Sequence, residues 1–104
     1  MAKYEQGLVV LHAPLGHFGL TVTSTPQVLP SLPALDRIRR VLIRTVDQPI
    51  CWTDDGTAPG PTSGMYLAAG DSLVYDGTRA DQIQLVKAAT ATANADLRVA
   101  YYGI

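Results

Sequence analysis

Two histidines are the first residues of this chain that could do chemistry, because imidazole nitrogens bind zinc and other transition metals. His12 and His17 lie five positions apart, across Pro14 and Gly16. A zinc site needs a third and a fourth donor on fixed elements, and no cysteine or carboxylate lies between the two histidines. We therefore predict no metal site and expect both histidines in a loop or at an interface.

An acidic pair followed by glycine, Asp54-Asp55-Gly56, raises the possibility of calcium binding. A calcium loop needs oxygen ligands at alternating positions and a late bidentate carboxylate. Residues 58–64 contain no acid, so the pair is better read as a turn. An Asp carboxylate can bond the backbone two residues further on, and glycine accepts a positive φ.

Catalysis would require a nucleophile with an activating base. Ser63 or Ser72 can be combined on paper with His17 and an aspartate, but the chain has no G-x-S-x-G elbow. Three loop glycines recur every four residues with no lysine or predicted helix after them, so they form no phosphate-binding loop: Gly56, Gly60 and Gly64. We predict a chain that is not an enzyme and holds no cofactor.

Aromatic side chains offer a different kind of site, because they can pack a core, fill a protein interface or stack on sugars. Tyr101 and Tyr102 are adjacent, so in a strand they point to opposite faces, and we expect one in the core and one outside. Core packing is the first interpretation for the whole set, and interface or sugar contact the alternatives: Trp52, Tyr66, Tyr75, Tyr101 and Tyr102.

Charge is sparse. Charged residues make up 16% of the 104 residues, against about 25% in typical domains. The net charge is −1, with no long run of one sign, so we expect no contact with nucleic acid or an anionic membrane. The densest basic cluster is Arg37, Arg39 and Arg40, for which solvated or interfacial salt bridges are the better interpretation. A thinly charged surface favours contact with protein.

The elements that must position these residues are short strands. Residues 41–46 alternate β-branched positions and predict a central strand, at about 38–46, buried on much of both faces. A long loop of turn-forming residues, 54–64, separates a strand at 50–53 from the apolar pattern that restarts at Met65. Further strands are predicted from period-2 patterns at 20–24, 72–76, 82–88 and 97–102, with an early apolar run at 8–11.

Turns and breaks complete the reading. The prolines within residues 26–33 indicate a crossing loop or an edge strand. Residues 34–39 could form a single helical turn. Turns are also expected at residues 76–77 and 94–96. Residues 79–95 are rich in alanine and suit a helix, but Ile83 and Leu85 alternate with neighbours, so we predict strand then turn. About seven or eight short strands predict a single-domain, all-β antiparallel β-sandwich or jelly-roll-like barrel.

The first residues are expected to form an N-terminal arm with a short strand (1–18) ahead of the sandwich (19–104). Their apolar run is too short for a signal peptide or a membrane span. The lone Cys51 excludes an intrachain disulfide and is expected to be buried.

Four short segments of the sequence resemble a group of small virion proteins of tailed bacteriophages. They are I-C-W-T-D-D-G-T-A-P (50–59), G-M-Y-L-A-A-G (64–70), L-V-Y-D-G (73–77) and L-R-V-A-Y-Y (97–102). The resemblance covers the chain from about Arg37 onward and departs from the family pattern at Cys51 and Thr53, where relatives often carry basic or aromatic residues. It implies virion membership and an all-β fold, and it carries over no catalytic site.

The resemblance leads to a specific hypothesis: a non-enzymatic capsid decoration or cement protein, assembled in the host bacterial cytoplasm as a dimer or trimer. Its partner would be the major capsid protein or another virion protein. A collar, head-to-tail or tail-attached protein, or a module that binds host glycans or receptors, are the alternatives. The proposed contact segments are 1–18, 26–33 and 54–64. The candidate interface residues are Trp52, Asp54, Asp55, Thr57, Pro59, Pro61, Tyr66, Arg37, Arg40 and Tyr102.

Overall fold

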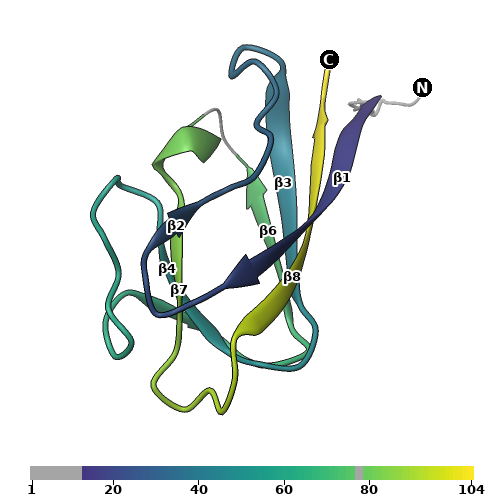
Figure 1. The fold of residues 1–104 in the computed structure, drawn as a ribbon. Coiled ribbons are helices and arrows are strands. Elements are labelled where there is room, and N and C mark those ends of the chain that lie inside the picture. The colour runs from purple at the N-terminus through teal and green to yellow at the C-terminus, as the bar shows by residue number, and fades with distance from the viewer. Residues whose placement is uncertain (1–12, 77–78) are drawn as a thin grey trace, which may run out of the picture.

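The computed structural model describes residues 13–76 and 79–104 as a sandwich of two four-stranded antiparallel sheets (Figure 1). This confirms the predicted all-β sandwich. The eight strands and one short 3-10 helix of the described residues are β1 (Ala13–Val22), β2 (Gln27–Val28), β3 (Ile38–Thr45), β4 (Ile50–Thr53), β5 (Met65–Leu67), β6 (Ser72–Asp76), η1 (Ala80–Gln82), β7 (Gln84–Lys87) and β8 (Ala95–Gly103).

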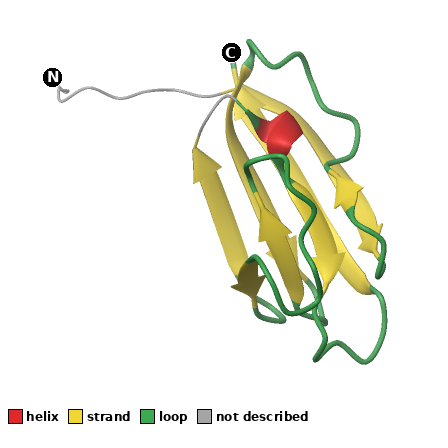
Figure 2. Ribbon diagram, turned by 90° about the vertical axis from the view of Figure 1, so that its left-hand side faces the viewer, coloured by secondary structure: helices red, strands yellow, loops and turns green. Residues whose placement is uncertain are grey.

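The strands pair in a nested order, in which the first strand pairs with the last, the second with the last but one, and so on. The sheets run β1-β8-β3-β6 and β2-β7-β4-β5, and β1 pairs with β8, β2 with β7, β3 with β6 and β4 with β5. The chain therefore resembles one long hairpin whose tip is the β4–β5 loop and which is wrapped into two layers, the jelly-roll arrangement. Figure 2 shows the strands of both layers with the loops closing their ends.

The core lies between the sheets, and the period-2 alternation of each strand decides which side chains enter it. In β3, Val41, Ile43 and Thr45 are fully buried, whereas Leu42 is half-buried and Arg44 is exposed. The prediction that this strand is buried on both faces is therefore wrong. The fold has only two layers, so nothing in the described residues covers the outer face of the central strand.

Strand β1 is longer than the sequence pattern indicates. It runs from Ala13 and pairs with β8 along its length, so it begins inside the range 1–18 assigned to an arm. Leu15 and Phe18 pack against the core. Residues 13–18 of the range assigned to the arm are therefore part of the sandwich itself. The apolar run at 8–11, His12 and Gly77 of the predicted 76–77 turn lie outside the described residues.

Residues 79–95 form no long helix. They contain the single turn η1, then β7, then a loop into β8, as the interpretation of strand followed by turn predicts. Residues 34–37 form a hydrogen-bonded turn, in which the Arg37 N–H donates to the oxygen of Ala34 over 2.9 Å. Within the described residues, no helix has the length and apolar character needed to cross a membrane.

Candidate interaction surfaces

The long loop 54–64 is shaped by its own side chains. The carboxylate of Asp55 accepts hydrogen bonds from the Thr57 N–H (3.1 Å) and the Thr57 hydroxyl (2.6 Å). These bonds hold the pKa of Asp55 below its usual value, the hydroxyl making the larger contribution. The predicted turn, in which an Asp bonds the backbone two residues on, is confirmed.

The same loop folds back onto the outer face of the β2-β7-β4-β5 sheet. The oxygen of Pro61 accepts hydrogen bonds from the Ala89 N–H (2.9 Å) and the Cys51 thiol (3.5 Å). Beneath it, Cys51, Val86 and Ala88 form a second buried cluster apart from the main core. Because this site is buried, the pKa of the Cys51 thiol is raised. The loop is thus partly a cover for the sheet.

A second attachment fixes the first part of the loop, at Gly56. The Gly56 N–H donates to the oxygen of Gln82 (3.1 Å), and the Gln84 side-chain amide donates to the oxygen of Gly56 (2.9 Å). Pro59 is buried, whereas Asp54, Asp55, Thr57 and Pro61 are exposed. Of the candidate loop residues, only the exposed ones are placed to meet a partner.

The aromatic candidates divide between core and surface. Tyr101 is fully buried and its neighbour Tyr102 is half-buried on the outer face, which confirms that the two point to opposite sides. Trp52 is half-buried and packs against the core. Tyr66 is 58% exposed on β5. Tyr66 is therefore the aromatic ring of this set that a partner can reach most freely.

The basic cluster is engaged locally. Arg40 forms a salt bridge of 2.6 Å with Asp76 on the neighbouring strand. The Arg37 side chain donates to the oxygen of Ile104 (2.8 Å), and Arg39 donates to the oxygen of Asp36 (2.7 Å). The predicted salt-bridge role holds for Arg40, while the other two arginines hydrogen-bond main-chain oxygens.

The candidate residues do not form one site. Arg40 and Tyr102 are opposite each other in the β3–β8 register and lie on the outer face of one sheet. Trp52 and Tyr66 belong to the other sheet, with the 54–64 loop. Among the described residues, no group of three or more potential metal ligands is found.

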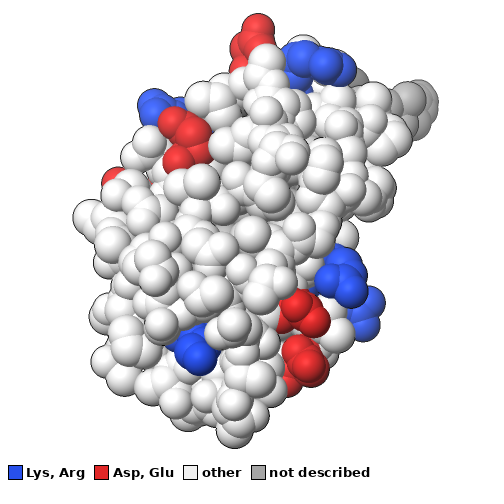
Figure 3. Space-filling model, viewed as in Figure 1, with Lys and Arg blue, Asp and Glu red and all other residues white. Residues whose placement is uncertain are grey.

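Four of the six large apolar side chains that are exposed among the described residues lie on edge strands, and the other two are Val46 and Ile104. The edge strands are β1 and β6 in one sheet and β2 and β5 in the other. Figure 3 shows one face of the molecule, on which charged side chains lie near the margin and a broad centre carries none. The exposed edge residues are Val28 on β2 (56%), Met65 (60%) and Tyr66 (58%) on β5, and Val74 on β6 (53%).

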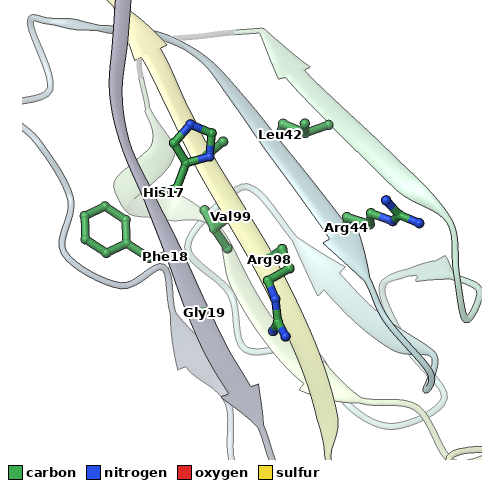
Figure 4. Close-up of a pocket in the computed structure, with 8 residues that line it drawn as sticks. His17, Phe18, Gly19, Leu42, Arg44, Arg98 and Val99 are labelled. Carbon is green, nitrogen blue, oxygen red and sulfur yellow. The ribbon is translucent and has the colours of Figure 1, made fainter.

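One surface feature was missed by the sequence reasoning. An open hollow of about 460 Å³ lies on the outer face of the β1-β8-β3-β6 sheet, between strands β1, β8 and β3 (Figure 4). It is lined by His17, Phe18, Gly19, Leu42, Arg44, Arg98, Val99 and Ala100. The alternation within residues 41–46 places Leu42 and Arg44 on one face, but the partner strand that supplies Arg98 is far away in the sequence.

Comparison with known proteins shows the fold and no family. No family model matches the chain. A stretch of 57 residues, 55% of the chain, is 40% identical to intercellular adhesion molecule 5 of Mus musculus, and the match spans 6% of that protein's length. A solved structure described as "Bacillus endospore appendages form a novel family of disulfide-linked pili" contains a chain that superposes with a TM-score of 0.50 and 16% identity, covering 90% of this chain and 88% of that one.

Proposed function

We propose that this chain is a non-enzymatic structural subunit of a larger protein assembly. The observation that carries the proposal is the exposure of Val28, Met65, Tyr66 and Val74 on three of the four described edge strands. Unpaired strand edges are templates for pairing with other chains, and free-standing domains usually protect them with charge. Here three edge strands each expose at least one large apolar side chain, and charged residues amount to only 16% of the chain, which suits edges that another subunit covers.

We further propose that the assembly is a tailed-phage virion and the subunit a capsid decoration or cement protein. The support is the resemblance carried by residues 50–59, 64–70, 73–77 and 97–102. The partner is then the major capsid protein, and the subunit acts as a dimer or trimer assembled in the host cytoplasm. A protein that binds the assembled shell and not its free subunits stabilises the shell by mass action.

The shared fold with a pilus structure agrees with a structural role in general terms. The disulfide linkage named for those pili is not part of this proposal, because the single cysteine of this chain, Cys51, is buried. A collar, head-to-tail or tail-attached protein of the virion differs from a decoration protein only in its partner and copy number.

A second class of function, binding of a host glycan or receptor, is favoured by one observation, the exposed ring of Tyr66. Against it, Trp52 packs on the core and so does not extend the ring into an aromatic platform. Binding of the purified protein to a glycan array that is abolished by Tyr66→Ala would support this alternative.

Co-sedimentation with emptied, expanded capsids tests the leading proposal. Hundreds of bound copies per particle are expected for a decoration protein, whereas about a dozen would indicate a portal, collar or tail location. Met65→Lys, which places a charge on the β5 edge, is expected to reduce the bound copies. Ser24→Lys, at an exposed position in the β1–β2 loop, is the matched control and should bind as the parent does. Absence of binding would overturn the capsid assignment.

A further inference from the structure

The hollow on the outer face of the β1-β8-β3-β6 sheet combines two arginines with an apolar floor. We propose that it is a docking site for an acidic segment of a partner protein, whose carboxylate binds between Arg44 and Arg98 while a neighbouring apolar side chain enters the hollow. The inference deepens the proposed function, and it rests on that function for the source of the segment, a neighbouring subunit of the assembly.

The two arginines are direct cross-strand neighbours. Arg44 of β3 is opposite Arg98 of β8 in the antiparallel register, so their side chains lie on the same outer face (Figure 4). Cβ atoms at such positions are about 5 Å apart, and like charges placed there repel. An anion between the guanidinium groups would convert this repulsion into attraction.

Neither arginine has an acidic partner in the described part of the chain. The ion pairs found there join Arg40 to Asp76 and Arg79 to Asp81. Arg98 donates only to the oxygen of Leu97, at 3.2 Å. The contrast within β3 is sharp, because the partner of Arg40 on β6 is Asp76, whereas the partner of Arg44 on β6 is Ser72.

Asp96 lies two residues before Arg98 on the same face of β8, and it also forms no salt bridge with Arg98. Asp96 accepts a hydrogen bond from the Thr21 hydroxyl at 3.5 Å and forms no salt bridge with the described residues. One end of this sheet face therefore carries the Arg40–Asp76 ion pair, whereas the other end presents Arg44 and Arg98 to solvent together with the exposed Asp96, which forms no salt bridge with either arginine.

The floor of the hollow is apolar and open. Leu42 is half-buried and Ala100 is 5% exposed. The guanidinium of Arg98 lies over Gly19, since a Cβ added at Gly19 would lie 3.7 Å from the nearest guanidinium nitrogen, an ordinary contact distance. His17 forms another wall. Phe18 and Val99 turn their side chains into the core.

Two arginines above an apolar floor favour a carboxylate on a peptide over the phosphates of a nucleic acid. The planar guanidinium fork matches a carboxylate or a phosphate equally well. A phosphate backbone, however, is bound by a broad basic surface, and this chain has a net charge of −1. A floor of Leu42, Ala100 and Gly19 instead suits a segment that pairs Glu or Asp with an aliphatic neighbour.

A peptide titration of the free protein tests the site. The probe is the acetylated, amidated peptide Gly-Leu-Glu-Leu-Gly, and the control peptide carries Gln in place of Glu. In ¹⁵N NMR spectra, the Glu peptide is expected to shift the side-chain Nε–H signals of Arg44 and Arg98 and the Gly19 amide. The Gln peptide should bind roughly tenfold more weakly. Equal binding of both peptides would overturn the proposal.

Substitutions separate recognition from a structural role. Arg44→Gln and Arg98→Gln should each weaken binding of the Glu peptide several-fold, while Arg79→Gln, which changes the net charge equally but lies in another ion pair, should not. Because repulsion is relieved, each of the first two should also raise Tm by roughly 1–4 °C. A fall in Tm, with peptide binding unchanged, would mean that the arginines are structural and would contradict the site.

Three further outcomes are decisive. Tighter binding of inorganic phosphate or a short oligonucleotide than of the Glu peptide would replace the carboxylate site by a polyanion site and overturn the proposal. Peptide binding with no capsid binding would retain the site while the virion assignment fails. Capsid binding that is unaffected by Arg44→Gln and Arg98→Gln, with no peptide binding, would retain the proposed function and reject this site.

Discussion

The phenol hydroxyl of Tyr101 donates a hydrogen bond to the main-chain oxygen of Pro30, which ties the C-terminal part of β8 to the segment that crosses from β2 to β3. Removing the hydroxyl by Tyr101→Phe leaves that oxygen without its donor. We expect a loss of about 1.5 kcal/mol in the free energy of unfolding, and a fall in Tm of roughly 6–12 °C. Thermal unfolding followed by circular dichroism measures it.

The matched control is Tyr102→Phe. Tyr102 is half-buried on the opposite face, and its hydroxyl makes no hydrogen bond with the described residues. Its removal should change Tm by less than about 2 °C. An equal fall for both variants would show that the Tyr101–Pro30 bond contributes nothing particular to stability.

Alkaline pH should weaken the fold through the same side chain. Burial raises the pKa of Tyr101, whereas in the unfolded chain a tyrosine ionises near pH 10. Below that pH both states hold the proton and the contribution is complete. Above it the unfolded chain releases its proton first, so the free energy of unfolding falls by about 1.4 kcal/mol per pH unit until the native pKa is reached.

Urea unfolding between about pH 9 and pH 12 measures this slope. Burial also raises the pKa values of Cys51 and Tyr75, which act in the same direction, so the comparison with Tyr101→Phe isolates the contribution of Tyr101. The variant should lose stability less steeply. Parallel curves for the two proteins would contradict the assignment.

Gly103 occupies a position where only glycine fits. An added Cβ would overlap the main-chain oxygen of Arg37, which already accepts a hydrogen bond of 3.0 Å from the Ile104 N–H. Because this neighbour is main chain, it cannot swing aside, and Gly103→Ala is expected to cost about 3 kcal/mol. Chemical denaturation is the readout. Gly19→Ala, in the adjacent strand with its nearest contact at 3.7 Å, should be close to neutral, and similar losses for both would argue against the steric account.

Thiol labelling reports whether the 54–64 loop stays closed over its sheet. The Cys51 thiol is buried, and its pKa is raised, so a thiol reagent should modify the native protein at least about 100-fold more slowly than the unfolded chain. Val86→Ala, which thins the cluster beneath the loop, should accelerate labelling roughly tenfold. The exposed Val74→Ala is the control and should have no effect. Rapid labelling of the unmodified protein would mean that the loop does not protect Cys51.

Local patterns in the sequence predict much of this fold. The strand at 50–53 and the strand at 72–76 have the bounds of β4 and β6, and the turn at Asp55 follows from the chemistry of its side chain. Strand β1 was only partly predicted, because Pro14, Gly16 and Gly19 interrupt its alternation. Its hydrogen-bond partners come from β8 at the other end of the chain, and tertiary pairing of this kind overrides local propensity.

The surfaces were harder to predict. The sequence shows that residues 54–64 form a loop, but not that the loop covers Cys51, because the covering contacts come from Pro61 and Ala89. Likewise, Arg44 and Arg98 become neighbours only through the register of β3 and β8. A single sequence contains no local signal for that register.

The nested pairing of the strands has a consequence for how the chain reaches this structure. β4 and β5 are neighbours along the chain, whereas β1 must wait for β8, which is synthesised after the seven other strands of the sandwich. Loop closure over such separations is costly, and folds dominated by distant pairings form in milliseconds to seconds. Until β8 has been made and has paired, the apolar residues of β1 and the edge of β3 are exposed to other nascent chains. The protein is therefore most prone to aggregation during this interval before folding is complete.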